Sequence, residues 1–174
     1  MTLGFAQWVI VAVAALRAAE LIWANHNTKR LFKRGGKEYG RGHYLLFVLL
    51  HGSWLIGLWI AIPPETPPNA SLLLLFVLLQ AGRAWVIWSL GPYWTTRVIS
   101  APDFPRIRRG PFRWVDHPNY MIVSAEIAVL PLAFSAWEIA LGFSLLNTAL
   151  LWWRIRIEAQ ALNERREPHS EIAC

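Results

Sequence analysis

A short run of polar and aromatic residues late in the chain has the residue types that chemistry at a membrane surface requires. The run from Gly110 to Tyr120 joins a cluster of arginines to an apolar segment that carries Glu126. His117 precedes a proline, a position biased away from helix, so we expect it in the loop just before the next helix. Together with its neighbours it could bind a carboxylate and stack on an aromatic or cationic ligand, or it could be only a surface polar group. Those neighbours are Arg113, Trp114, Asn119 and Tyr120.

Several charged residues fall within apolar stretches, where an isolated charge costs about 2.5–3.5 kcal/mol at the centre of a bilayer. Each therefore needs a partner or a place near the interface. Arg17 and Glu20 are three residues apart on one predicted helix, so we expect them to pair. Glu126 either lines a polar cavity or serves as a structural partner of Arg83.

Near the end of the chain, Arg154 and Glu158 are four residues apart and share a helical face. One interpretation is an interfacial anchor, in which Trp and Arg lie at the level of the lipid headgroups. The other depends on the last two helices. If they form a hairpin, Tyr120 and Glu158 lie at the same end of it, and one shared pocket follows.

The composition is that of a membrane protein. Hydrophobic residues make up 55% of the 174 residues and charged residues 16%, against about 25% charge in an average soluble domain. The mean hydropathy is +0.33. Five apolar spans are predicted, each a candidate membrane crossing: Leu3–Ala24, Tyr44–Ile62, Ser71–Leu90, Asn119–Phe134 and Trp137–Trp153.

The predicted fold class is thus an all-α integral membrane protein of about five transmembrane helices. We divide it into a three-helix region (1–90), a long loop followed by a helical hairpin (91–163) and a cytosolic tail (164–174). The fourth span would be only about 24 Å long at 1.5 Å per residue, and Pro131 is expected to bend it. Ser135 and Ala136 form its short connection to the fifth span.

Basic residues alternate between the predicted loops. The first loop, the third loop and the tail are rich in Lys and Arg, whereas the second loop (63–70) and the fourth contain none. By the positive-inside rule, the N-terminus lies outside and the C-terminus in the cytoplasm. Orientation thus explains the net charge of +6, and we expect contacts with membrane lipids but no binding of nucleic acid. A lone cysteine, Cys174, excludes an internal disulfide and a cysteine-based zinc site, and no metal is expected. The oligomeric state is left open.

Three motifs in order resemble those of the isoprenylcysteine carboxyl methyltransferase family of integral-membrane enzymes. His117-Pro118-Asn119-Tyr120 is similar to its Arg-His-Pro-x-Tyr motif. The stretch from Arg154 to Leu162 is similar to its Arg-Ile-x-x-Glu-Glu-x-x-Leu motif, and Leu90–Arg97 to its Leu-Gly-x-x-Trp-(Ser/Thr) stretch. The resemblance covers about Leu90 to Asn163. Asp116, Ile122 and Ala159 depart from the family pattern, which usually has Arg, Gly and Glu there.

The resemblance implies S-adenosylmethionine bound at the cytosolic end of the last two helices. It assigns cofactor binding to His117, Tyr120 and Glu158, and we add their neighbours Asn119 and Arg113. It makes Arg154 a candidate for contact with the acceptor or the cofactor. The full set of candidate catalytic residues is Glu126, Arg154 and His117, and the candidate acceptor-binding residues are Tyr93, Trp94, Arg97 and Trp114. The aromatic members of the last set could instead form an interfacial belt.

The implied activity is O-methylation of a lipid-tailed acceptor that enters from the bilayer. The His-Pro-Asn-Tyr pattern looks closest to a bacterial branch thought to methylate the phenolic or enolic hydroxyl of alkylresorcinols and alkylpyrones, so we expect a bacterial inner membrane. A prenylcysteine carboxylate is already ionised near pH 7 and needs only alignment with the methyl donor. A phenol, with a pKa near 10, benefits from a general base. His117, Glu126, His43 or His51 could serve, and both acceptor classes stay open.

A non-catalytic alternative is a small transporter or scaffold subunit whose charges at Arg17, Glu20 and Arg83 serve transport or assembly. The sequence has no inverted repeat with paired broken helices, which counts against a transporter.

Overall fold

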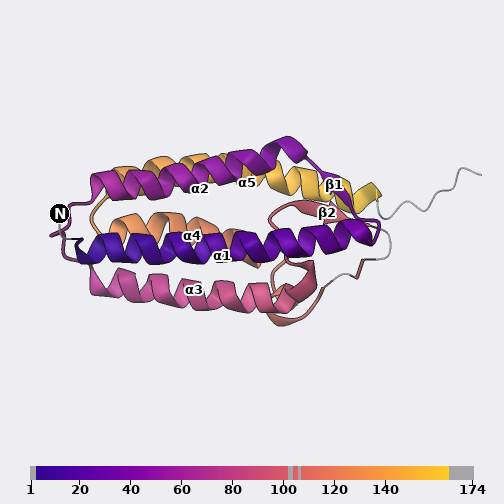
Figure 1. The fold of residues 1–174 in the computed structure, drawn as a ribbon, viewed down its shortest axis with the longest axis horizontal. Helices are drawn as coiled ribbons and strands as arrows, with labels where there is room; N and C mark the ends of the chain where they lie inside the picture. The colour runs from indigo at the N-terminus through magenta and orange to yellow at the C-terminus, as the bar shows by residue number, and fades with distance from the viewer. Residues whose placement is uncertain (1–2, 102–103, 106, 165–174) are drawn as a thin grey trace, which may run out of the picture.

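The computed structural model describes residues 3–101, 104–105 and 107–164. Five long helices lie side by side in an elongated bundle (Figure 1). They are α1 (Phe5–Lys33), α2 (Arg41–Ala61), α3 (Ala70–Leu90), α4 (Pro118–Ala133) and α5 (Trp137–Glu164). The connections hold two short strands, β1 (Lys37–Tyr39) and β2 (Val98–Ser100), and two short 3-10 helices, η1 (Gly91–Tyr93) and η2 (Gly110–Arg113).

Three of the described helices are long and apolar enough to cross a membrane, namely α1, α2 and α3. Helix α4 is apolar but has only 16 residues, or about 24 Å at 1.5 Å per residue, less than the roughly 30 Å of a bilayer core. The predicted five helices are therefore present, while a crossing by α4 and α5 stays a prediction.

Large apolar side chains face outward along the bundle. Trp88 is 85% exposed, Ile60 78% and Ile22 73%. Soluble proteins rarely expose such continuous apolar surface, whereas lipid tails solvate it. The chain is therefore an integral membrane protein.

Helix α1 is longer than the span predicted at Leu3–Ala24, because the helix continues through polar residues to Lys33. Arg30 and Lys33 occupy its last turn, where positive charge interacts favourably with the helix dipole. The basic residues predicted for the first loop thus begin on the last turns of α1, beyond its apolar segment.

The all-α class is confirmed, and the connections add one feature that it did not include, a short antiparallel ribbon of β1 and β2. Lys37 lies opposite Ser100, and Tyr39 opposite Val98. Each strand has three residues, too few to show an alternating pattern, and the pairing joins segments about sixty residues apart in sequence. Gly40, with φ of +62°, supplies the left-handed conformation that turns the chain from β1 into α2.

Helices α4 and α5 form the predicted antiparallel hairpin. The turn has the Schellman pattern, in which the Ser135 N–H donates to the Leu132 carbonyl and the Ala136 N–H to the Pro131 carbonyl. Ser135 adopts φ of +60° at this turn. Pro131 lies in the last turn of α4, which ends two residues later. A bend at this proline stays a prediction.

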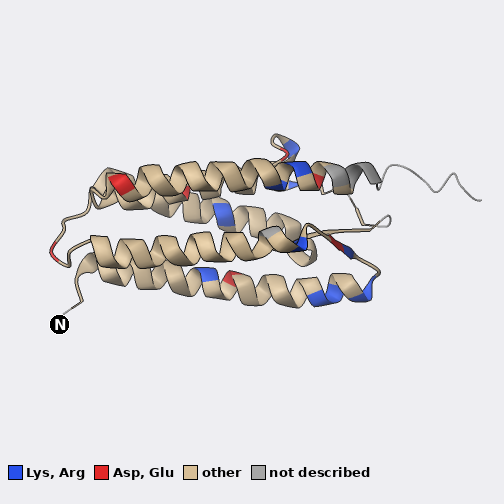
Figure 2. Cartoon of the chain, turned by 90° about the horizontal axis from the view of Figure 1, so that it is seen from above, with Lys and Arg blue, Asp and Glu red and all other residues tan. Residues whose placement is uncertain are grey.

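The two ends of the bundle differ in charge. The N-terminus, the connection between α2 and α3 and the α4–α5 turn lie at one end, and the β-ribbon and the end of α5 lie at the other (Figure 1). Lys and Arg gather at the ribbon end, and a small group of opposite charges lies midway along the bundle (Figure 2). This distribution agrees with the alternation of basic loops. The cytoplasmic orientation of the ribbon end stays a prediction.

Candidate active site

The hairpin brings three predicted site residues into direct contact at the ribbon end. Tyr120 lies in the first turn of α4, and Arg154 and Glu158 lie one turn apart on α5. The Tyr120 hydroxyl donates a hydrogen bond to Glu158 Oε1. Arg154 Nε donates to the same hydroxyl oxygen at 2.7 Å and lies 3.7 Å from Glu158 Oε1. One hydroxyl group thus connects a cation, a carboxylate and two helices.

His117 completes this cluster. It caps the start of α4, and its ring stacks on the Tyr120 ring with centroids 5.1 Å apart and planes 8° apart. Its Nδ1 lies 3.4 Å from Glu158 Oε2. The side chains of His117 and Glu158 are 39% and 23% exposed, so a soluble ligand can reach both.

Arg154 is held by three other parts of the chain. Its Nη1 donates to the Thr96 carbonyl at 2.9 Å, and its guanidinium lies 5.3 Å from the centre of the Phe47 ring of α2. The side chain is only 10% exposed. These contacts fix the position of the guanidinium group, and fixed donors are what a reaction centre needs.

Two cavities adjoin this cluster, and the larger of the pair has a volume of about 770 Å³. Its walls are the β2 segment, the stretch around η2 and the end of α5. Seven predicted site residues line it: Tyr93, Arg97, Arg113, Trp114, His117, Arg154 and Glu158. The wall combines cations, a carboxylate and aromatic rings.

The smaller cavity has a volume of about 310 Å³ and lies deeper in the bundle. Its wall is mainly apolar, with residues such as Leu21, Val48 and Leu55. Tyr120 and Asn119 face it from α4, and Trp94 faces it after η1. Five residues able to carry charge complete the wall: Arg17, Glu20, His51, Arg83 and Arg154.

The two cavities meet at one wall. Thr95 and Arg154 line both of them. Tyr120, on the smaller cavity, is bonded to Glu158, on the larger one. Ligands in the two cavities would therefore approach each other beside these side chains.

The structure distributes the predicted residues differently from the sequence assignment. Asn119 and Tyr120, predicted to bind cofactor, face the smaller cavity. Tyr93, Arg97 and Trp114, predicted to bind the acceptor, line the larger one, and Trp114 is 70% exposed. Trp94 lines the smaller cavity and is 4% exposed.

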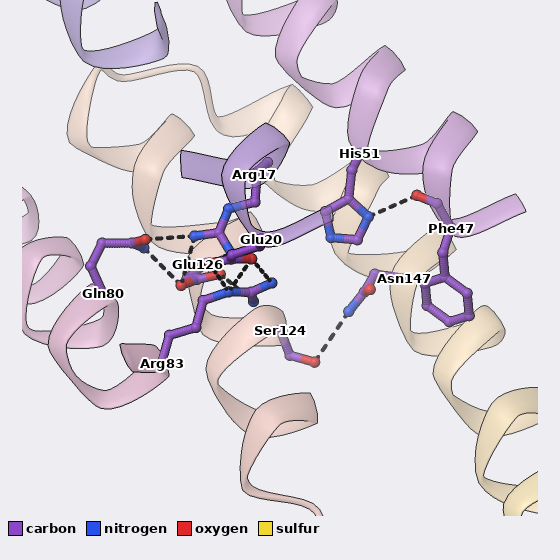
Figure 3. Close-up of polar contacts among 9 residues, drawn as sticks. All are labelled: Arg17, Glu20, Phe47, His51, Gln80, Arg83, Ser124, Glu126 and Asn147. Atoms are coloured by element: carbon purple, nitrogen blue, oxygen red, sulfur yellow. Dashed lines mark hydrogen bonds and ion pairs between the residues drawn. The ribbon is translucent and has the colours of Figure 1, made fainter. Parts of the chain in front are cut away.

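The structure does not bring Glu126 into the site, and Glu126 lines neither cavity. Its Oε2 accepts from Arg83 Nη1 at 3.2 Å and its Oε1 accepts from Gln80 Nε2 at 2.7 Å (Figure 3). This is the structural alternative, in which Glu126 is a partner of Arg83.

The predicted pairing of Arg17 with Glu20 is confirmed, with Nη1 and Oε2 2.9 Å apart. Arg83 Nη2 contacts the same carboxylate oxygen at 2.7 Å, and Arg17 Nη2 lies 3.5 Å from Glu126 Oε1. Two arginines and two glutamates from α1, α3 and α4 thus form a charge-balanced cluster in the middle of the bundle (Figure 3). Mutual pairing is what makes charges tolerable at this depth.

Residue-by-residue assignment from the sequence missed Glu38, Phe47 and Thr95. Glu38 on β1 holds Arg97 at 3.2 Å, and Arg97 stacks over the Tyr44 ring at 4.6 Å. Nothing local in the sequence marks Glu38, because its partner comes from the distant β2 segment. Thr95, by contrast, lies inside the Leu90–Arg97 motif and could have been chosen from it.

Comparison with known proteins identifies the family of the chain. Residues 72–164 match the model of the isoprenylcysteine carboxyl methyltransferase (ICMT) family, and the match contains the hairpin and both cavity-sharing residues. The chain belongs to this family. Among curated proteins, it is 34% identical over 162 residues to "Uncharacterized protein YpbQ" of Bacillus subtilis (strain 168), covering 90% of this chain and 96% of that protein. No solved structure matches.

Membership of the ICMT family means that this is a membrane protein of a methyltransferase family. The matched residues include the whole cluster of His117, Tyr120, Arg154 and Glu158. Enzymatic methyl transfer is therefore the activity class of the family. The match contains Arg83 and Glu126 of the ion cluster, whereas Arg17 and Glu20 lie outside it.

Proposed function

We propose that the protein is an S-adenosylmethionine-dependent O-methyltransferase that acts on a lipid-tailed acceptor. The observation that carries this proposal is the shared wall at Thr95 and Arg154. Direct methyl transfer requires the donor and the acceptor to be held in contact and in line, and two cavities that meet at fixed side chains meet that requirement.

The larger cavity fits the cofactor in size and chemistry. Its volume of about 770 Å³ is within the range of about 300–1,000 Å³ of small-molecule sites. Arg97 and Arg113 can pair with the carboxylate of the cofactor's amino acid, and Glu158 with its ammonium group or ribose hydroxyls. The aromatic rings of Tyr93 and Trp114 can face a sulfonium or an adenine ring. When bound, the cofactor supplies a methyl group on a positively charged sulfur.

Tyr120, Arg154 and His117 fix the position of Glu158 in the proposed cofactor site. Tyr120 and Arg154 hold the Glu158 carboxylate from two sides, so it stays in one position between the cavities. His117 covers the Tyr120 ring and contacts the other carboxylate oxygen. Removal of His117 or Glu158 should therefore weaken cofactor binding directly.

The smaller cavity fits the head of an acceptor and the first part of its tail. Its apolar wall would bind hydrocarbon, and the Arg154 guanidinium, on the wall shared with the larger cavity, can contact the reacting oxygen. With the cofactor bound, transfer of its methyl group to that oxygen would leave the electrons of the carbon–sulfur bond on sulfur, and the proton of a hydroxyl acceptor would pass to a base in the site. By the positive-inside rule the basic ribbon end faces the cytoplasm, so the larger cavity, which lies at this end, is open to the cytoplasm.

The test is calorimetric titration of S-adenosylhomocysteine into the detergent-purified protein and into its His117→Ala and Glu158→Ala variants. We expect micromolar binding in the wild type and at least a tenfold loss in each variant. Glu138→Ala is the control, because Glu138 is an exposed glutamate in the first turn of the same helix, α5, at the opposite end of the bundle. No binding by a folded wild type would refute the enzyme and favour the transporter or scaffold alternative.

A further inference from the structure

His51 is a half-buried titratable residue to which the proposed chemistry gives no role. It lies in the middle of α2 and lines the smaller cavity. Its Nδ1 is 2.8 Å from the Phe47 carbonyl oxygen, one helical turn earlier (Figure 3). A carbonyl oxygen only accepts hydrogen bonds, so Nδ1 carries the hydrogen. This contact selects the ring tautomer.

The surroundings of His51 favour the neutral ring. Arg17 and Arg83 share its cavity wall, and a third positive charge beside them is unfavourable. Glu20 also lines this wall, but its carboxylate already binds both arginines. Among the residues that the structure describes, no carboxylate pairs with the ring. A neutral ring with hydrogen on Nδ1 presents Nε2 as a hydrogen-bond acceptor.

Nε2 has no hydrogen-bond partner within the described ranges, and the ring lies on a mainly apolar cavity. A ligand hydroxyl group in this cavity would therefore find a free hydrogen-bond acceptor in Nε2. Two other residues of the same wall hold buried atoms without partners in the described structure, the Trp94 indole Nε1 and the Asn119 amide oxygen. The polar part of this cavity is therefore incomplete without a ligand.

These atoms distinguish between a hydroxyl group and a carboxylate as the head group of the methyl acceptor. A hydroxyl group both donates and accepts, so it can satisfy His51 and still accept a hydrogen bond. A carboxylate only accepts, and its charge would face the lone pair of Nε2. The three cations of this wall are already paired with carboxylates: Arg17 and Arg83 with Glu20 and Glu126, and Arg154 with Glu158.

We infer that His51 Nε2 accepts a hydrogen bond from a neutral hydroxyl group of the acceptor and thereby makes the smaller cavity selective for hydroxyl-bearing lipids over carboxylates. This inference rests on the proposed function, since it names the acceptor class of the same site. His51 is a specificity-determining residue that contacts the acceptor. It needs no movement of the helix, because the Phe47 contact already orients the ring.

The experiment compares three probes that differ in the head group. They are 3-pentadecylphenol, its methyl ether and hexadecanoate, each titrated in detergent into the protein saturated with S-adenosylhomocysteine, with intrinsic tryptophan fluorescence as the readout. We expect the wild type to bind the phenol at least tenfold more tightly than the ether, because a site built for a hydroxyl group rejects the analogue that cannot donate. Hexadecanoate should bind more weakly than the phenol.

Three variants identify the residue responsible. His51→Phe should reduce phenol binding to the level of the ether, and His51→Leu is the second apolar replacement if the first does not fold. His51→Gln should restore part of the discrimination, because its amide oxygen can accept a hydrogen bond. Binding of S-adenosylhomocysteine should be unchanged in all three.

Two results would overturn the inference. They are equal binding of phenol and ether by the wild type, and discrimination that persists in the folded His51→Phe or His51→Leu protein. Tighter binding of hexadecanoate than of the phenol would also overturn it and point to a carboxyl acceptor. Failure of the wild type to bind S-adenosylhomocysteine is a different result, because it refutes the proposed function itself.

Discussion

The Tyr120 hydroxyl on α4 donates a hydrogen bond to the Glu158 carboxylate on α5, at the open end of the hairpin. Tyr120 lines the smaller cavity and Glu158 the larger one, so this bond passes between them. Arg154 donates to the same hydroxyl from one turn before Glu158. The pair therefore couples the position of a cofactor-side carboxylate to the wall of the acceptor cavity.

Replacing Tyr120 with Phe removes both hydrogen bonds of that hydroxyl while keeping the ring under His117. We expect the affinity for S-adenosylhomocysteine to fall about tenfold and the free energy of unfolding to fall by about 1 kcal/mol. Calorimetry and thermal unfolding in detergent measure the two effects. Thr148→Val is the control, since the exposed Thr148 hydroxyl bonds only within α5, to the Ser144 carbonyl. Unchanged affinity in Tyr120→Phe would show that Glu158 does not depend on this bond.

Replacing Glu126 with Gln tests whether this residue is structural or catalytic. It leaves Arg83 and Arg17 with one carboxylate fewer in a buried cluster, and breaking a buried ion pair costs about 3–5 kcal/mol of stability. We expect a lower thermal midpoint but unchanged binding of S-adenosylhomocysteine per folded molecule. The double variant Glu126→Leu/Arg83→Met should be less destabilised than the sum of its single variants. A variant that keeps its thermal midpoint but loses methyl transfer would instead make Glu126 catalytic.

Replacing Gly110 with Ala should distort the segment that leads to His117. Gly110 has φ of +58°, and an added methyl group would overlap with the Ser89 side chain on α3. Left-handed conformations and such overlaps are unfavourable for alanine, so we expect weaker binding of S-adenosylhomocysteine and a lower thermal midpoint. Gly142→Ala on α5 is the control, because a methyl group there meets open space and alanine favours helix by up to about 1 kcal/mol. Equal behaviour of the two variants would contradict this account.

Replacing Glu38 with Gln should loosen the β-ribbon over the larger cavity. The Glu38 side chain is 4% exposed and holds Arg97 at 3.2 Å, and Arg97 lines that cavity. We expect a several-fold loss of S-adenosylhomocysteine affinity, with Arg97→Ala giving a similar loss. Arg41→Ala is the matched control, since Arg41 also contacts Glu38 but is 84% exposed, and exposed pairs contribute little. Loss of binding in Arg41→Ala alone would show that the ribbon is held in another way.

Much of the fold could be predicted from the sequence because its signals are local. Long apolar runs specify the helices of the bundle, and the short connection at Ser135 and Ala136 makes the last two antiparallel. The spacing of Arg17 and Glu20 on one helix predicts their pairing, which is confirmed. The β-ribbon could not be predicted in this way, since two three-residue strands pair only when distant segments meet.

The candidate site, too, could be predicted only in part from the sequence. His117, Tyr120, Arg154 and Glu158 could be placed at one end of the hairpin from their positions along two helices, and they do form one cluster. The sequence by itself determined the residue types, the membrane-protein class and the family. Only the tertiary structure decided that Glu126 pairs with Arg83 without lining either cavity. It also decided that Thr95 and Arg154 line both cavities and that His51 lines the smaller one. The physical reason is that these relationships depend on how the helices are rotated and packed against one another, and packing joins side chains that no spacing within one helix can relate.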